Sequence, residues 1–392
     1  MRNLGSKNPQ IASRWRLTVI AALLALASGP TIASDLPVFL SDDPIGVPLR
    51  VRNFTYPSLF FLGFAPAPAA PLGKGVLAVE LHHSKINYFQ MSPSVESYLR
   101  DSRGDSRRRL DVADVDAIAS MPAGEAFYFD GEIDYTELFI HWGLTDRLDL
   151  SFALPYIRFS GGSLDGLIYD FHDALGLGQA GRDYVEEQRF QAVFAADGII
   201  WEAFLDRPSR GGIGDPSLYL RYAIPKSLGR WQFSVGAGAK APVADKDAGL
   251  SSGGWDFGLL LTADLRLSKN ALIVNLGYVV PGTVQGIDIS RTRDFDLPNL
   301  PSLNLSWIHR FNRWKRTRTF VQILLSEHPL RDFVNSDLSD PEFQITFGLK
   351  WATKAGVFGI GLTENVFHYA NTPDIGIHLS WGNFFRRHRD RQ

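Results

Sequence analysis

The residues with the clearest potential for chemistry lie together in the stretch from Leu164 to Leu175. It contains Asp170, His172 and Asp173, and carboxylate and imidazole groups are common ligands of divalent metal ions in proteins. The stretch is typical of a short helix, on which a spacing of two residues places Asp170 and His172 on different faces. We therefore treat Asp170, His172 and Asp173 as weak metal candidates and expect no metal or other cofactor. The alternative is a solvated helix that folds over the molecule as a lid.

A serine and a histidine near the C-terminus could form part of a hydrolytic site. His378 and Ser380 are two residues apart, and a nucleophilic serine needs a histidine base and a third, orienting group. The sequence offers no obvious third group, and on a strand the two side chains would lie side by side on one face. A lipid hydrolase therefore remains an alternative, and we predict that the chain is not an enzyme.

Arginines and acidic residues are interleaved between residues 100 and 111. The arginines are Arg100, Arg103, Arg107, Arg108 and Arg109. Because arginine binds phosphate oxygens in a bidentate manner, these side chains could contact the phosphates of lipopolysaccharide. The interpretation that we prefer is a solvated surface loop.

The elements that would position these residues are strands, because two-residue alternation of apolar and polar side chains dominates the chain after residue 75. In residues 254–267, for example, Phe257 and Leu259 lie on one face and Asp256 on the other. Such a strand has an apolar side and a charged side. A soluble sandwich and a membrane barrel both have strands of this kind.

The connections between the strands decide between these two folds. They are alternately very short, as at residues 145–146 and 353–354, and long, as at residues 89–126 and 161–212. Outer-membrane barrels have this asymmetry of short periplasmic turns and long extracellular loops. The sequence therefore predicts an all-β fold, a transmembrane antiparallel barrel of about twelve strands within residues 75–385. The predicted strands begin near residues 75, 127, 147, 213, 230, 254, 271, 301, 318, 342, 355 and 373.

The first 33 residues have the features of a secretory signal peptide. The basic residues Arg2, Lys7, Arg14 and Arg16 precede an apolar run, Leu17 to Ser28, that is too short to span a bilayer as a helix. Small residues at Thr31 and Ala33 place the cleavage after Ala33. The expected location of the mature chain is the bacterial outer membrane.

Charge and cysteine content exclude several classes of protein. The chain has 40 basic and 42 acidic residues, and four of the basic ones precede Ser34, which leaves 36 and a formal charge of −6. This mildly acidic balance argues against a nucleic-acid partner. The chain has no cysteine, which excludes a disulfide framework and any thiolate site.

The two segments that flank the barrel have different compositions. Residues 34–74 are rich in proline, which cannot donate to a strand ladder, but also hold several aromatic side chains. We interpret them as an N-terminal plug at or inside the periplasmic mouth, with a flexible periplasmic tail as the alternative. The plug candidates are Phe54, Tyr56, Phe60 and Phe61. Residues 386–392 form a basic C-terminal tail.

The polar faces of the strands would line the inside of such a barrel. The pore-lining candidates are Glu137, Arg221, Lys240, Asp256, Asp264, Arg266, Asn275, Asn304, Lys350 and His378. Buried charges need partners or water, so these residues either form a salt-bridged polar core or line a pore and set its selectivity. Twelve strands favour a narrow passage over a wide diffusion pore.

Several short runs resemble an uncharacterised family of bacterial outer-membrane proteins, domain of unknown function 3187. The runs are Pro48 to Asn53, Phe129 to Glu132, His141 to Leu148, Leu154 to Tyr156, Gly161 to Asp165, Phe171 with His172, Gly212 to Asp215, and Arg221 with Tyr222. The resemblance implies a barrel of this kind and carries over no activity.

The function that we predict is an outer-membrane channel or transport protein that passes a small solute through a narrow lumen gated by loops and plug. The alternatives are an outer-membrane lipid hydrolase and a structural or adhesive surface barrel that works through its loops. The expected partners are outer-membrane lipid and lipopolysaccharide, the barrel-assembly machinery and a small-molecule solute.

Overall fold

The computed structural model describes residues 46–104, 106–121, 126–176, 178–196, 199–205, 209–284, 297–313, 316–331, 340–364 and 372–386. The predicted signal peptide, the first twelve residues of the predicted plug and residues 387–392 of the predicted tail lie outside these ranges. Within them, no helix is both long enough and apolar enough to cross a membrane.

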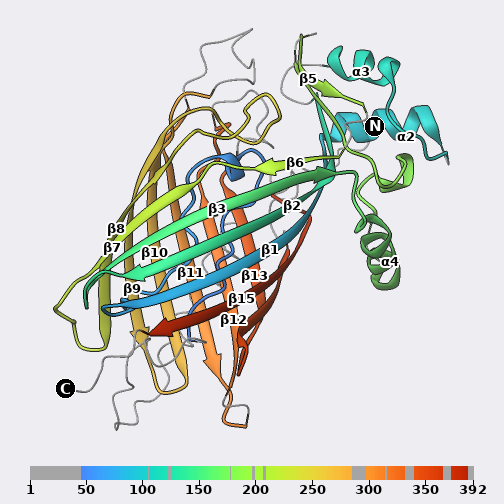
Figure 1. The fold of residues 1–392 in the computed structure, drawn as a ribbon. Helices are drawn as coiled ribbons and strands as arrows, with labels where there is room; N and C mark the ends of the chain where they lie inside the picture. Colours follow the sequence, from blue (N-terminus) through green and yellow to red (C-terminus); the bar gives the residue numbers. More distant parts are fainter. Residues whose placement is uncertain are drawn as a thin grey trace, which may run out of the picture. The chain divides into compact units, whose positions relative to one another are not determined.

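Twelve antiparallel strands form a closed barrel (Figure 1). They are β1 (Val76–Met91), β2 (Ala126–Gly143), β3 (Leu148–Ser160), β7 (Ser217–Ala223), β8 (Trp231–Lys240), β9 (Asp256–Arg266), β10 (Asn270–Val280), β11 (Leu300–Arg310), β12 (Thr317–Ser326), β13 (Glu342–Thr353), β14 (Gly356–Glu364) and β15 (Ile375–Arg386). Each strand pairs with its neighbours in this order, and β1 pairs with β15 from Val76↔Arg386 to Asn87↔Ile375. The predicted all-β barrel of about twelve strands is confirmed.

The strand starts lie within two residues of the predicted ones, except for the fourth strand. That strand was expected from residue 213 and begins at Ser217. Pro216 has no N–H to give to the ladder, and the carboxylate of Asp215 accepts hydrogen bonds from the amides of Val243 and Ala244, both at 3.0 Å. The chain therefore leaves the ladder for three residues before β7 starts.

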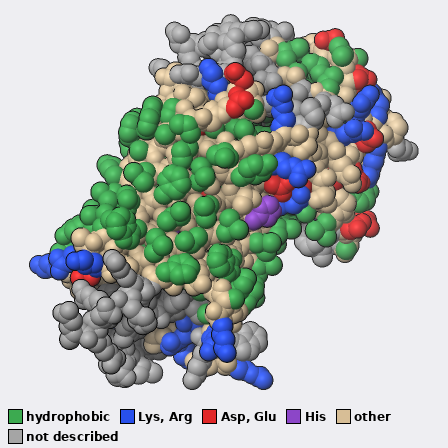
Figure 2. Space-filling model, in the orientation of Figure 1, with side chains coloured by type: hydrophobic (Ala, Val, Ile, Leu, Met, Phe, Trp, Pro, Cys, Tyr) green, Lys and Arg blue, Asp and Glu red, His purple; other side chains and the backbone are tan. Residues whose placement is uncertain are grey.

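The barrel wall is apolar outside and polar inside, the reverse of a water-soluble protein. On β9, Leu259 is 65% exposed, whereas Asp256 and Asp264 on the opposite face are fully buried. Figure 2 shows hydrophobic side chains over the visible face of the barrel wall. A contiguous exposed apolar surface of this kind is suited to contact with lipid.

The long connections lie at one end of the barrel, the long-loop end, and the short turns lie at the other, the short-turn end. The long segments contain further elements: α2 (Pro93–Arg103), α3 (Val112–Ala119), α4 (Asp165–Leu175), η2 (Arg182–Tyr184), β4 (Gln191–Ala196), β5 (Ile199–Phe204) and β6 (Arg210–Ile213). Of these, only α4 matches a predicted element. The strand β4 pairs with the first five residues of β2, and β6 pairs with the last part of β3, so these strands extend beyond the rest of the barrel at the long-loop end.

We expect an arginine in the middle of the apolar wall to destabilise the barrel strongly. Leu261 lies at the centre of β9 with an outward, 44% exposed side chain. Leu261→Arg should cost about 2–4 kcal/mol of unfolding free energy in a bilayer, because a cation at the midplane loses its hydration. Reversible urea unfolding in lipid vesicles measures this cost.

The matched control is Leu228→Arg, because Leu228 is 72% exposed in the turn between β7 and β8. It should change stability by less than about 0.5 kcal/mol. Equal costs for the two variants would contradict the assignment of the wall to lipid.

Candidate functional site

The lumen of the barrel is occupied by residues 46–74, which we call the luminal segment and which appears as the blue trace inside the strands in Figure 1. Its first leg begins near the short-turn end, where Lys350 Nζ donates to the carbonyl of Pro48 at 3.4 Å. The leg ends near the long-loop end, where Ser58 Oγ donates to Glu342 at 2.5 Å. Lys350 and Glu342 lie towards opposite ends of β13, so the first leg runs along the lumen.

The second leg returns to the short-turn end. The amide of Leu62 donates to Asp256 at the start of β9 at 2.8 Å, and the amide of Leu72 donates to Asp149 in β3 at 3.1 Å. Between them, Asn275 contacts both backbone groups of Ala67: its Oδ1 accepts from the amide at 3.3 Å and its Nδ2 donates to the carbonyl at 2.8 Å. The apex between the legs is the 3-10 turn η1 (Ser58–Phe60).

Glycines in the wall make room for side chains of this segment. Gly238, Gly258 and Gly277 on the neighbouring strands β8, β9 and β10 surround the ring of Phe64. A Cβ added at any of them would lie within 2.7–3.2 Å of that ring. The ring of Phe64 therefore fits a pocket that larger residues would fill.

Each of the ten pore-lining candidates is a buried or half-buried residue on the inner side of the wall. Several bind the luminal segment directly: Arg221 donates to the carbonyl of Pro68 at 2.5 Å, Arg266 to that of Gly46 at 2.9 Å and Lys350 to that of Pro48. Others bind each other or polar wall neighbours. These are Asp264 with Arg266, Asn304 with Ser306, Glu137 with Tyr135, and Lys240 with Asp256.

All four plug candidates belong to the luminal segment and pack on the wall or on each other. The ring of Phe54 lies 5.3 Å from that of Tyr135 and 5.6 Å from that of His378. The ring of Tyr56 stacks on Phe129 at 5.1 Å, and Phe60 and Phe61 are buried. Sequence composition identified these rings, but not that the segment reaches the long-loop end.

Sequence reasoning missed a buried charged cluster around Glu80 near the short-turn end. Arg50 of the luminal segment donates to Glu80 at 3.0 Å, and the Nε2 atoms of His82 and His141 lie 3.3 and 3.8 Å from the same carboxylate. Alternation along β1 and β2 places these wall residues inside, but only the fold brings Arg50 to them. This ion pair anchors the first leg of the luminal segment.

A second charged cluster holds one long loop against the mouth of the barrel. The ammonium of Lys240 lies 3.0 Å from Asp215 and 3.2 Å from Asp256. Asp215 also accepts from Ser251 at 2.6 Å and from backbone amides of residues 243 and 244. The loop after β8 is thereby folded inward, and its Leu250 is buried in the same apolar core as Phe60.

His378 and Ser380 do not form a nucleophile and base pair. Nδ1 of His378 is 2.8 Å from the hydroxyl of Ser84, and Nε2 is 2.7 Å from that of Thr363. Both ring nitrogens are therefore occupied by neighbours on β1 and β14, and the ring packs against Phe54 of the luminal segment.

The weak metal candidates Asp170, His172 and Asp173 lie on α4, where the two aspartates are exposed and His172 is half-buried. Within the described ranges, no three or more histidines and carboxylates are arranged to hold a metal ion. The position of α4 depends instead on Asp165, which accepts from Asn87 at 3.0 Å and from the amide of Gln188 at 2.7 Å.

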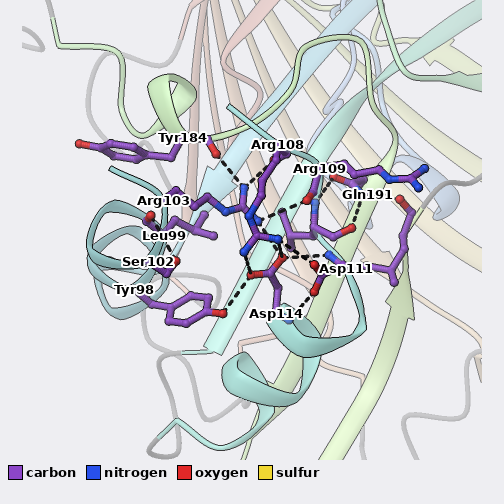
Figure 3. A network of polar contacts seen from close by, with 12 residues as sticks. Tyr98, Leu99, Ser102, Arg103, Arg108, Arg109, Asp111, Asp114, Tyr184 and Gln191 are labelled. Atoms are coloured by element: carbon purple, nitrogen blue, oxygen red, sulfur yellow. Dashed lines mark hydrogen bonds and ion pairs between the residues drawn. The ribbon is translucent and has the colours of Figure 1, made fainter. Parts of the chain in front are cut away.

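The preferred interpretation of residues 100–111 as a simple solvated loop is wrong. They form part of a surface subdomain (residues 93–119 and 182–196), in which Arg103 and Asp114 are fully buried and 2.8 Å apart (Figure 3). Arg103 also donates to the carbonyls of Arg108 and Tyr184, and Tyr98 donates to Asp114 at 2.9 Å. Arg103 and Asp114 thus join α2, α3 and η2.

The exposed arginines of this region are largely paired with acids of the same subdomain. Arg107 contacts Glu187 at 2.8 Å, and Arg108 contacts Asp111 at 2.7 Å. The amide of Asp114 donates to Asp111 at the start of α3 and holds the pKa of that carboxyl below its usual value. These contacts weaken the case for a dedicated phosphate site, because the guanidinium groups already have carboxylate partners.

The chain matches one family model and resembles several solved structures. The model described as a protein of unknown function (DUF3187) matches residues 110–385, and no curated protein sequence matches the chain significantly. The chain is similar to the COG4313 outer membrane channel from Pseudomonas putida F1, with 13% identity, a TM-score of 0.51, and coverage of 82% of this chain and 100% of that chain. This likeness shows a shared outer-membrane barrel fold.

Two further solved structures have lower TM-scores. The toluene transporter TodX from Pseudomonas putida has 9% identity, a TM-score of 0.35, and coverage of 90% of this chain and 99% of that chain. LpxR from Salmonella typhimurium has 10% identity, a TM-score of 0.34, and coverage of 79% and 100%. At these scores neither likeness bears on what this chain does.

We expect Asn275 to be a principal anchor of the second leg. Asn275→Ala leaves the buried amide and carbonyl of Ala67 without this partner, which should cost about 1–3 kcal/mol of local stability. Backbone amides of residues 61–70 should then exchange roughly 5- to 150-fold faster. Deuterium exchange with mass spectrometry measures the rate.

The control is Asn299→Ala, because Asn299 is exposed and donates only to the hydroxyl of Tyr278 on the outer side among the contacts described. Exchange in residues 61–70 should not change in this variant. If exchange in residues 61–70 is unchanged in Asn275→Ala as well, the second leg does not depend on the side-chain amide of Asn275.

Proposed function

The chain belongs to the DUF3187 family, and from the construction of its lumen we propose that it is a channel of the bacterial outer membrane that is closed by its own luminal segment. The observation that carries this proposal is the path of residues 46–74, which run from the short-turn end to the long-loop end and back inside the barrel. In the outer membrane the short turns would face the periplasm and the long loops the exterior.

The attachment of the segment supports a removable plug rather than a permanent core. Polar wall side chains bind backbone groups of the segment, such as the carbonyls of Gly63 and Pro68. Water can replace such hydrogen bonds, since a typical neutral one contributes only about 0.5–1.5 kcal/mol and one with a charged group about 1.5–3 kcal/mol. The wall ladder does not include the segment, so the barrel can stay closed on itself when the segment leaves.

The polar wall also suits a channel once the segment has left. Arg221, Lys240 and Lys350 would face water beside Asp149, Asp256 and Asp264, and charged rings of this kind set selectivity in pores. We propose a non-enzymatic role, because His378 binds Ser84 and Thr363 instead of activating a nucleophile. The solute would be small, since twelve strands enclose a narrow lumen.

We expect a disulfide between segment and wall to lock the channel. A Cβ at position 277 would lie 3.8 Å from the Cβ of Phe64, which matches the mean Cβ–Cβ separation in disulfides. Phe64→Cys with Gly277→Cys should suppress openings in planar bilayers when oxidised and restore them when reduced. Ser302→Ala should accompany both changes, because its hydroxyl would lie 2.5 Å from the new Cβ.

The chain has no native cysteine, so other thiols cannot compete. Each single-cysteine variant with Ser302→Ala is the control and should conduct alike with and without reductant. Deletion of residues 46–74 should give steady conductance larger than that of the intact chain. No conductance from the deletion variant, with the barrel shown to be folded, would overturn the proposal.

A second candidate function, adhesion or recognition at the cell surface, is supported by the surface subdomain. This part has its own apolar core, which includes Val95, Leu99 and Ile118, and its own buried ion pair. A mobile loop would not need either feature. The subdomain would therefore present a fixed surface at the long-loop end of the barrel.

We expect Asp114→Ala to disrupt this subdomain and leave the barrel intact. Loss of one partner of a buried ion pair typically costs about 3–5 kcal/mol, because the other charge stays buried and unpaired. Limited proteolysis should cut residues 93–119 faster, while conductance stays unchanged. Asp116→Ala on the exposed side of α3 is the control. Normal attachment of cells that carry the disrupted subdomain would argue against the adhesive function.

A further inference from the structure

Seven aromatic rings form a cluster at the long-loop end of the lumen. Two belong to the luminal segment (Tyr56, Phe60), and three belong to the strands β1, β2 and β3 (Tyr88, Phe129, Phe159). Phe190 directly precedes β4, and Phe194 lies in it. Three parts of the chain that are far apart in sequence thus meet at one place, which we call the aromatic cluster.

The central ring of the cluster is Phe129 of the wall. It lies 5.3 Å from Tyr88, 6.1 Å from Phe190 and 6.2 Å from Phe194. Tyr56 of the luminal segment stacks on it at 5.1 Å, with 29° between the ring planes. Rings of the wall and of the β4 region thus surround Phe129 on several sides, and Tyr56 of the luminal segment covers a further face of it.

The second ring of the segment occupies an equivalent place beside β3. Phe60 lies 6.4 Å from Phe159 and 5.4 Å from Tyr56, and Phe159 lies 5.7 Å from Phe190. Tyr56 and Phe194 are only half-buried, so their rings are partly accessible. The apex of the segment therefore places its rings at the long-loop end of the lumen.

The chemistry of the cluster differs from that of the lower lumen. Guanidinium groups lie over wall rings at two lower levels of the lumen: Arg50 over Phe139 at 5.1 Å near the short-turn end, and Arg52 over Tyr135 at 5.5 Å at the middle of β2. Among the described residues, no arginine or lysine lies over a ring of the aromatic cluster. The carboxylate of Glu342 beside the cluster is already bound to Ser58 and Asn53. A flat apolar solute would gain stacked and edge contacts with the rings.

We propose that the aromatic cluster is the binding site of a small apolar aromatic solute, and that the rings of Tyr56 and Phe60 occupy it in the closed state. The solute and the apex of the luminal segment compete for the faces of Phe129 and Phe159. Binding of the solute therefore favours departure of the segment. This inference rests on the proposed channel function and names the class of solute that the channel takes.

The test measures binding in the full-length protein without requiring conduction. The probe is 5-fluoroindole, titrated into purified protein and followed by ¹⁹F NMR, with glucose as a polar competitor. Tyr56→Ala with Phe60→Ala should bind the probe saturably and at least tenfold more tightly than the unchanged chain, because both competing rings are gone. Adding Phe129→Ala should abolish this gain, and glucose should not displace the probe.

The matched control is Phe64→Ala, which removes a ring of the same segment from the glycine-lined pocket on the opposite wall. It should not increase binding. Equal gains in Phe64→Ala and in the double variant would show a generic cavity and overturn the proposal, as would no saturable binding in the double variant. Binding in the double variant without conductance after removal of residues 46–74 would refute the channel and leave the site. Conductance after the deletion without binding in the double variant would refute the aromatic site and leave the channel.

Discussion

An irregular backbone inside a barrel must have its hydrogen bonds satisfied, and this constraint governs the structure. Residues 46–74 contain many prolines and only one short turn, so they satisfy only some of their own amides and carbonyls, mainly around η1. The wall supplies the partners from side chains, for example Asp256 for the amide of Leu62 and Arg221 for the carbonyl of Pro68. The charges of the lumen are thus first of all ligands of a peptide backbone.

This arrangement explains why the strands could be predicted from the sequence, whereas the hydrogen-bond partners of their inner side chains could not. Alternation along β9 shows that the side chains of Asp256 and Asp264 lie on the inner face, because the two-residue period of a strand can be recognised locally. Nothing near Asn275 in the sequence indicates that it binds Ala67, about two hundred residues earlier. Gly238, Gly258 and Gly277 likewise have no local explanation, because the ring of Phe64 that approaches them belongs to the folded luminal segment.

The long-loop end shows the same division between local and distant information. The start of α3 has a local signal in Asp111 and Asp114, a reciprocal cap of the helix, and Pro93 lies at the start of α2. Both helices could therefore have been found from sequence. The strand β4 could not, because it forms by pairing with Ala126–Asp130 at the start of β2. The buried position of Arg103 depends on a distant partner as well, the carbonyl of Tyr184 about eighty residues later.

The same constraint determines what opening must involve. When the luminal segment leaves, Glu80 loses its ion pair with Arg50. Arg221 and Arg266 lose the backbone carbonyls to which they donate. Water must then enter to solvate these groups, because an unpaired charge in a low-dielectric lumen is very costly. Opening and hydration are thus one event. The apex is subject to the same constraint, because Ser58 and the amide of Leu62 bind the buried carboxylates of Glu342 and Asp256. Water must therefore reach these carboxylates as well when the rings of the aromatic cluster separate.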